Sequence, residues 1–263
     1  MNIKIEDFNL IRTRVIPCLL LRGQGLVKTT NFEHPKYIGD PINSVRIFNE
    51  KEVHELVFLD ITATNEKRSP RFDLISNIAS ECFMPLGYGG GIKTLEDMHQ
   101  IFSLGVEKII INSVAVESPS IIQEASDLFG SQSIVVSIDA KKNFFGDYCI
   151  LTHSGKIKTL WDPIKWAQEA EQHGAGEILL TAIDRDGTMK GYDIPLIRSV
   201  SKSISIPVVA CGGAGKIDDF NKAIHEGGAS AVAAGSMFVY YGKHRAVLIN
   251  FPGDEELTSG GLN

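Results

Sequence analysis

The chain has 263 residues, 43% hydrophobic and 22% charged, which supplies enough apolar side chains for one sizeable α/β domain. Its 26 basic and 32 acidic residues give a formal net charge of -6, which argues against a nucleic-acid surface driven by net charge and favours a small anion as the ligand. The N-terminus has no apolar signal-peptide region, and no run of 18 apolar residues follows, so we expect a soluble, cytoplasmic protein that does not contact a membrane.

Short apolar runs rich in β-branched residues alternate with stretches of helical period. We predict eight strands, at residues 14–21, 55–62, 84–91, 108–113, 134–140, 177–184, 207–213 and 231–236. The helical stretches include residues 41–52, 71–82, 92–102, 120–130, 162–174, 195–204 and 215–225, several of which end at glycine or before proline. This pattern predicts a (β/α)₈ barrel, with an open doubly wound sheet as the alternative.

We predict a single barrel domain over residues 1–250, with two long loops and a C-terminal tail. The loop at residues 22–40 is longer than a connection requires, and we expect either a lid over the catalytic face or an extra surface hairpin. Residues 141–159 alternate like a β-hairpin. The polar, glycine-rich residues 251–263 are expected to form a disordered tail.

A repeated segment favours the closed barrel. "PLGYGGG" (85–91) and "PVVACGG" (207–213) are both apolar strands that run into glycines before a helix, and they lie 122 positions apart. The same offset matches Leu95 to Ile217, Asp97 to Asp219 and Gly105 to Gly227. We therefore predict two duplicated half-barrels, each with a glycine loop whose backbone N–H groups can bind a phosphate.

Polar residues follow the predicted strands at their carboxyl ends, where (β/α)₈ barrels place their functional groups. Asp60, Asp139 and Asp184 are candidates for chemistry, although an aspartate after a strand is also a common helix cap or turn former. The glycine loops pair with small polar strand ends, which suits a ligand with a phosphate at each end. Glycines kept only for tight turns are the plainer alternative.

No metal or cofactor is expected. Cys18, Cys82, Cys149 and Cys211 lie far apart, form no Cys-x-x-Cys pair and have no histidine at a zinc-site spacing.

Several motifs together resemble one family. "IPCL", "LVKTTNF", "ELVFLDITAT", "GGGIKTLED", "SIDAK", "GAGEILLTAIDRDGTMKGYD" and "ACGGAGKIDDF" are similar to HisF, the cyclase subunit of imidazole glycerol phosphate synthase, over about residues 14 to 240. The resemblance implies a duplicated barrel that binds a HisH-type glutaminase at the strand N-termini. Ammonia would cross the barrel and attack phosphoribulosyl-formimino-aminoimidazole carboxamide ribotide, giving imidazole glycerol phosphate and aminoimidazole carboxamide ribotide.

The resemblance also implies site residues. Those for the bisphosphate substrate are Lys28, Gly90, Gly91, Asn112, Ser113, Asp186, Gly187, Gly212, Gly213, Gly235 and Ser236, with Asp139 as the catalytic residue. A ring of four charges that gates ammonia entry would be Arg14, Glu55, Lys108 and Glu177. Without the resemblance, these four would be interpreted as solvated strand starts.

One departure affects the predicted chemistry. The family reads "IPCLD" at the end of strand 1, with an aspartate that acts beside the strand-5 aspartate, whereas this chain has Leu20 there. Losing a positioned acid or base typically costs about 10²–10⁴ in rate. Tyr88 and Cys211 are lesser departures beside the glycine loops.

Three hypotheses follow from this departure. The first is a lyase-type cyclase of histidine biosynthesis in which Asp60 or a loop residue supplies the missing acid. The favoured one is a paralogue, similar to the second HisF-type protein of bacterial surface-polysaccharide (O-antigen, lipopolysaccharide) gene clusters, whose ammonia serves a sugar amidotransferase. The third is a non-catalytic phosphate-binding scaffold.

Overall fold

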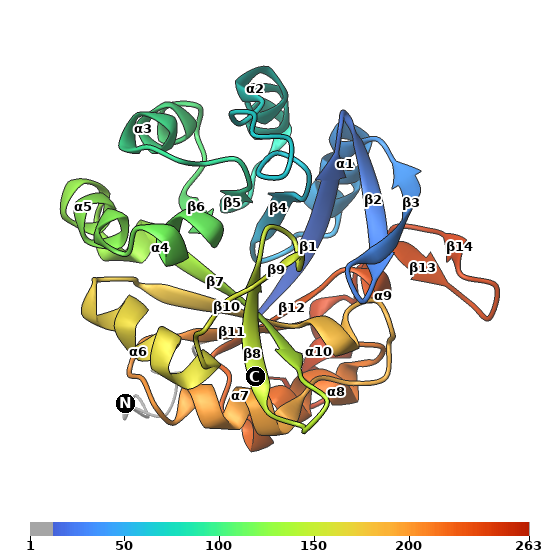
Figure 1. Cartoon of the computed structure of the whole chain (residues 1–263). Coiled ribbons are helices and arrows are strands. Elements are labelled where there is room, and N and C mark those ends of the chain that lie inside the picture. The colour runs from blue at the N-terminus through green and yellow to red at the C-terminus, as the bar shows by residue number, and fades with distance from the viewer. Residues whose placement is uncertain (1–12, 263) are drawn as a thin grey trace, which may run out of the picture.

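The computed structural model describes residues 13–262, and they form a closed barrel of eight parallel strands (Figure 1). Neighbouring strands pair in the order β10, β11, β12, β1, β4, β5, β6 and β7, and β7 pairs with β10 to close the barrel, with Thr181 opposite Asp139. The strands are β1 (Arg14–Arg22), β4 (Leu56–Asp60), β5 (Leu86–Gly89), β6 (Lys108–Ile111), β7 (Ile134–Lys142), β10 (Glu177–Ala182), β11 (Val208–Cys211) and β12 (Ala231–Ala234). All eight lie within two residues of the predicted starts, and the (β/α)₈ fold is confirmed.

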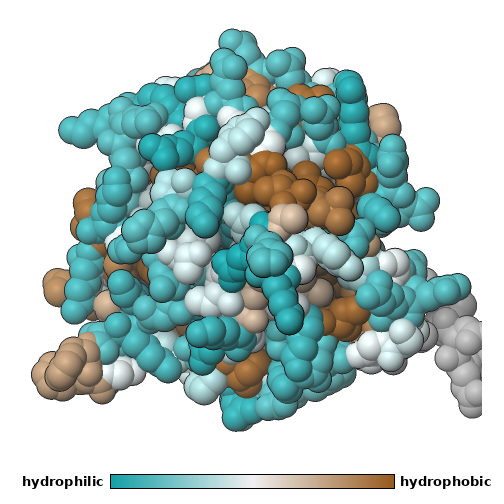
Figure 2. Space-filling model, turned by 90° about the vertical axis from the view of Figure 1, so that its right-hand side faces the viewer, coloured by the Kyte–Doolittle hydropathy of each residue, from teal (hydrophilic) through white to brown (hydrophobic). Residues whose placement is uncertain are grey.

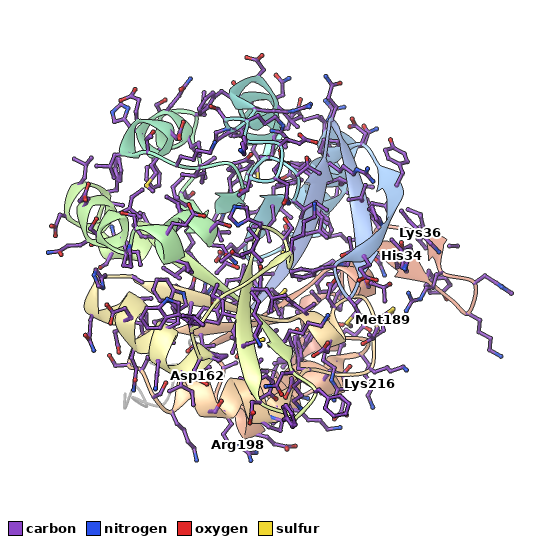
Figure 3. The ribbon with its side chains drawn as sticks, in the orientation of Figure 1. His34, Lys36, Asp162, Met189, Arg198 and Lys216 are labelled. Atoms are coloured by element: carbon purple, nitrogen blue, oxygen red, sulfur yellow. The ribbon has the colours of Figure 1, made fainter. Side chains whose placement is uncertain are left out.

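Helices surround the barrel, as Figure 1 shows. They are α1 (Pro41–Glu50), α2 (Phe72–Glu81), α3 (Leu95–Ser103), α4 (Ser113–Glu117), α5 (Ser120–Phe129), α6 (Pro163–Gln172), α7 (Ile194–Ser201), α8 (Ile217–Asn221), α9 (Ser236–Val239) and α10 (Asp254–Ser259). A π-helical turn at Lys222–Glu226 continues α8. Capping residues define where several of these helices begin. In α6, Asp162 (labelled in Figure 3) directly precedes Pro163, and its carboxylate accepts hydrogen bonds from the N–H groups of Ile164 and Lys165.

The strands separate two apolar cores because alternate side chains point to opposite faces. The outer core lies between barrel and helices and includes the buried rings of Phe48, Trp166 and Phe220. The inner core fills the barrel with smaller side chains, among them Ile16, Cys18, Val57, Ile110, Val135, Leu179, Val209, Ala231 and Ala233. Tyr88 belongs to the outer core, so this departure from the family does not reach the barrel interior.

The predicted duplication appears in matching hydrogen bonds. One Asp97 carboxylate oxygen accepts from the N–H groups of Lys93 and Thr94, at 3.0 and 3.1 Å. The Asp219 carboxylate accepts in the same way from residues 215 and 216, at 2.9 and 3.1 Å. Each acceptor and donor is 122 positions from its counterpart, so the two halves share this carboxylate cap. The first half adds a hydrogen bond from the Asp97 N–H to the Thr94 hydroxyl, which Lys216 at the matching position does not provide.

Both long loops form antiparallel extensions of barrel strands. β2 (Gly25–Thr30) pairs with β1 and β3 (Glu33–Gly39), and it makes the 22–40 segment a hairpin. Lys28, Thr29 and Phe32 of this hairpin line the cavity described below, so it borders the face that the lid prediction named and is more than a surface hairpin. β8 (Tyr148–Thr152) pairs with β7 and β9 (Ile157–Lys158), as expected for a hairpin. A further small hairpin joins β13 (Tyr240–Tyr241) and β14 (Ala246–Val247).

The C-terminal segment differs from the expected disordered tail. Helix α10 lies within it, and the side chains of Leu257 and Leu262 are buried. The side-chain amide of Asn221 also donates to the carbonyl oxygen of Gly260. Burial of these two leucines stabilises the segment against the barrel, although most of its residues are polar.

Candidate functional site

A cavity of about 530 Å³ opens at the carboxyl ends of the barrel strands. Its lining includes every residue predicted for substrate binding and catalysis: Lys28, Gly90, Gly91, Asn112, Ser113, Asp139, Asp186, Gly187, Gly212, Gly213, Gly235 and Ser236. The structure therefore brings the two glycine loops and the strand-5 aspartate around one space. The individual roles of these residues stay predictions.

The glycine loops need glycine for steric reasons. Gly90 has φ +108°, and a Cβ there would lie 2.2 Å from the carbonyl oxygen of Asp60. Gly212 has φ +88°, and its Cβ would lie 2.8 Å from the carbonyl oxygen of Ala182. These loops are tight turns whether or not they bind phosphate.

Two buried polar atoms beside the glycine loops have no partner among the described residues. They are the side-chain oxygen of Asn112 and the hydroxyl of Ser236, one in each half-barrel. The other polar atom of Asn112 donates to the Asp139 carboxylate at 2.9 Å. Because a buried polar atom without a hydrogen bond is costly, these two atoms favour a ligand in the cavity.

Asp139 is held in a form suited to proton transfer. The pKa of its carboxyl group is raised to about 7, first by burial and second by the nearby Asp186 carboxylate, against the lowering effect of hydrogen bonds from Asn112 and Ser137. A carboxyl group that titrates near neutrality can donate or accept a proton at working pH.

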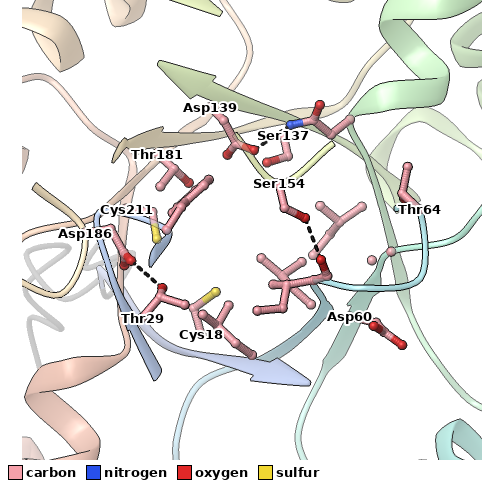
Figure 4. Close-up of a pocket in the computed structure, with 18 of the residues that line it drawn as sticks. Cys18, Thr29, Asp60, Thr64, Ser137, Asp139, Ser154, Thr181, Asp186 and Cys211 are labelled. Atoms are coloured by element: carbon pink, nitrogen blue, oxygen red, sulfur yellow. Dashed lines mark hydrogen bonds between the residues drawn. The ribbon is translucent and has the colours of Figure 1, made fainter. Parts of the chain in front are cut away.

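Lys28, from the first half of the chain, and Asp186, from the second half, form a buried ion pair. The Lys28 ammonium lies 2.9 Å from one carboxylate oxygen of Asp186, and the hydroxyl of Thr29 donates to the other at 2.7 Å (Figure 4). Burial alone would lower the pKa of Lys28, but the Asp186 carboxylate outweighs it and raises that pKa. Lys28 thus lies on strand β2 as a fixed cation, within reach of Gly235.

Leu20 occupies the cavity wall at the family's carboxylate position, beside Leu59 on β4. Asp60, the predicted substitute, does not supply a free acid. Its carboxylate accepts from the N–H groups of residues 62 and 63, both at 3.1 Å, and from the guanidinium of Arg68 at 2.7 Å. In Figure 4 it lies at the edge of the cavity, which fits the turn-forming interpretation.

Asp184 is exposed and accepts a hydrogen bond from the N–H of Lys142. It does not line the cavity.

The turn between β8 and β9 contributes cavity residues that the sequence did not reveal. His153 and Ser154 line the cavity with φ values of +55° and +57°. The N–H of His153 donates to the Ser113 hydroxyl at 3.0 Å, and the Ser154 hydroxyl donates to the Ile61 carbonyl at 2.7 Å. The hairpin itself was predicted, but its tip turns back over the mouth because of these contacts.

The four predicted ring residues meet at the amino ends of the strands. Arg14 pairs with both Glu55 and Glu177, and Lys108 pairs with the same two carboxylates at 3.1 and 2.8 Å. Directly above lies a cavity of about 10 Å³, whose lining shares Cys18 and Ile110 with the large cavity. The ring, the small cavity and the large cavity thus follow one another along the barrel interior.

Among residues 13–262, no group of three or more histidine, cysteine, aspartate or glutamate side chains is placed to hold a metal ion. Within the same range, every helix is too short or too polar to cross a membrane.

Fold and cavity define a (β/α)₈-barrel protein with its candidate site at the carboxyl ends of the strands. The family model described as "Histidine biosynthesis protein" matches residues 14–245, so the chain belongs to this family, within which its relatives place it in the HisF type.

Three relatives illustrate the match. "Putative imidazole glycerol phosphate synthase subunit hisF2" of Pseudomonas aeruginosa is 52% identical and covers 95% of this chain and 100% of its own. A protein of Leptospira interrogans, "Putative imidazole glycerol phosphate synthase subunit HisF", is 48% identical over 94% of this chain and 98% of its own. "Imidazole glycerol phosphate synthase subunit HisF" of Endomicrobium trichonymphae is 50% identical, covering 86% and 87%.

Proposed function

We propose that this chain is the HisF-type subunit of a glutamine-dependent amidotransferase. It takes ammonia from a HisH-type glutaminase bound at the strand N-termini, and the ammonia serves a sugar amidotransferase of surface-polysaccharide biosynthesis instead of the family's cyclisation. The observation that carries the proposal is the selective change along the barrel: the ring of charges is intact, whereas Leu20 stands in the cavity wall where the family has a carboxylate.

The carboxylates that line the cavity support the loss of cyclase chemistry. They are Asp60, Glu117, Asp139 and Asp186. Asp60 is tied to a turn and Asp186 to Lys28, while Glu117 is exposed at the rim and 3.6 Å from His153. Asp139 therefore has no free carboxylate beside it to form an acid–base pair.

A second candidate function is the family's own cyclase reaction with another group in place of the strand-1 aspartate. The presence of every predicted phosphate-site residue in the cavity lining favours it. His153 is a candidate for the substitute because it lines the same cavity.

The experiment that separates these functions supplies ammonium and the ribotide bisphosphate to the purified chain. We expect no imidazole glycerol phosphate above background from the wild type. In the Leu20→Asp variant the rate of product formation should rise by about 10²–10⁴, provided that the two glycine loops bind the phosphates of the substrate. The measurement is product formation by liquid chromatography. A wild-type rate clearly above background would contradict the proposal and support the cyclase.

A second prediction concerns the ring. Glu177→Ala leaves Arg14 and Lys108 with only Glu55, so we expect glutamine to be hydrolysed by the partner while less of its ammonia reaches the acceptor. We also expect the free energy of unfolding to fall by about 2 kcal/mol, because both cations are partly exposed and can be rehydrated. Paired assays of glutamate release and amination measure the coupling.

The control is Glu81→Ala, which breaks an exposed ion pair with Arg46 and should leave the free energy of unfolding and the coupling nearly unchanged. Glutamine-dependent amination that stays equal in wild type and Glu177→Ala would rule out a gate at this ring.

A further inference from the structure

The excursion between β7 and α6, residues 141–160, presents an unusual outer surface. It carries four of the ten large apolar side chains that are exposed in the described chain: Phe144, Phe145, Ile157 and Leu160. Phe144 and Phe145 are 97% and 86% exposed. The face shown in Figure 2 is mainly hydrophilic, with one hydrophobic patch in its upper part. Large apolar side chains gathered on one exposed element are typical of a protein interface.

The tip of the excursion is a built turn. The side-chain oxygen of Asn143 accepts from the N–H groups of Phe145 at 2.8 Å and Asp147 at 3.0 Å, and Gly146 adopts φ +91°. The rings of Phe144 and Phe145 stand edge to face with centroids 5.6 Å apart. Aromatic side chains presented on an ordered turn lose little conformational freedom on binding, which makes them effective anchors.

The charge of the excursion indicates what kind of surface its binding partner presents. Residues 141–160 contain four lysines and one acid, Asp147, although the whole chain has a net charge of -6. The ammonium of Lys142 lies 3.5 Å from the Asp193 carboxylate, so the positive charge offered to a partner comes from the other three lysines. An acidic surface with apolar pockets would be complementary.

The same excursion also reaches the cavity, because its second turn places His153 and Ser154 in the lining. The Phe144–Phe145 tip lies at the other end of β8 from this turn, beyond the carboxyl end of β7. A protein that binds the tip therefore approaches from the carboxyl-end side of the barrel and reaches the mouth by extending along the excursion.

We propose that the Phe144–Phe145 tip is the docking site of the ammonia acceptor, an enzyme with an acidic, apolar recess that covers the barrel mouth. This rests on the proposed function. Ammonia is largely protonated in neutral water and then loses its nucleophilicity, so the acceptor has to seal the end of the barrel opposite the glutaminase. The tip, on the carboxyl-end side of the barrel, supplies apolar anchors, and the lysines supply the orientation.

The test measures binding of a purified sugar amidotransferase of the surface-polysaccharide type to the full chain by calorimetry. The Phe144→Ser/Phe145→Ser variant should bind at least about 30-fold more weakly, with glutaminase binding and glutamine turnover unchanged. Tyr241→Ser is the matched control, because Tyr241 is a 68% exposed aromatic residue on the separate β13–β14 hairpin, away from the excursion and from the amino ends of the strands.

The outcomes separate the two proposals. If the wild type binds the amidotransferase and the double variant binds it equally well, the docking site is wrong and the proposed function stands. If the wild type binds the glutaminase but not the amidotransferase, the proposed acceptor is wrong, and the docking proposal fails with it. Loss of self-association in the double variant, seen by sedimentation without any change in amidotransferase binding, would assign the tip to a second copy of this chain.

Discussion

Replacing Asp139 with asparagine is expected to stabilise the protein at alkaline pH. Burial and Asp186 raise the pKa of the Asp139 carboxyl to about 7, against about 4 for an unfolded chain. The folded state therefore holds this proton more tightly than the unfolded state. Stability from this group is fully present below pH 4, and it is lost as the pH rises through 7.

Asparagine does not ionise and keeps the size of the side chain, so the variant avoids this loss. At pH 8 its free energy of unfolding should exceed that of the wild type by as much as about 4 kcal/mol, shrinking to about 1–2 kcal/mol near pH 5. Urea unfolding between pH 5 and 8 measures the difference. The control is Asp184→Asn, an exposed strand-end aspartate outside the cavity, which should stay within about 0.5 kcal/mol of wild type.

Parallel stability curves for Asp139→Asn and wild type would mean that Asp139 is ionised at little cost, as in a water-filled cavity. The expected curves would instead establish one buried carboxyl near half protonation at neutral pH. A single group of this kind can exchange a proton with a ligand, but it cannot act as acid and base in the same step. Because Leu20 stands where the family has its second carboxylate, Asp139 is left without an acid–base partner.

The strands and the site could be predicted for a common reason. Most barrel strands are compact apolar runs, and the glycines that follow β5 and β11 occupy backbone conformations that other residues avoid, as at Gly90 and Gly212. Because parallel strands end on one face, residues as distant in sequence as Asn112 and Asp139 had to converge there.

Other features depend on contacts that sequence pattern does not encode. The fold-back of His153 over the cavity is fixed by Ser113 on another element. Asp60 forms a turn and is not a free acid because Arg68, eight residues later, donates a hydrogen bond to its carboxylate. The ordering of the C-terminal segment depends on a single buried face around Leu257. In each case a contact with a residue elsewhere in the fold set a local structure that the sequence pattern alone did not determine.

Breaking the Lys28–Asp186 pair is expected to be the most destabilising single change in the cavity. Lys28 is 6% exposed, and Asp186 accepts from both its ammonium and the Thr29 hydroxyl. Asp186→Ala leaves a buried cation without its carboxylate, so the free energy of unfolding should fall by about 3–5 kcal/mol. Urea unfolding at pH 7 measures the change.

The double variant Lys28→Met/Asp186→Leu isolates the cause. It replaces both charges with apolar groups of similar length, and it should recover to within about 1 kcal/mol of wild type, because the cost lies in the uncompensated charge. If Asp186→Ala alone costs less than about 1 kcal/mol, Lys28 is hydrated in the cavity and the pair is not structural. Lys28 also borders the second predicted phosphate site, because a Cβ at Gly235 would lie 3.1 Å from its ammonium group. Inorganic phosphate should therefore stabilise Asp186→Ala more than wild type, because it supplies the negative charge that the variant lacks.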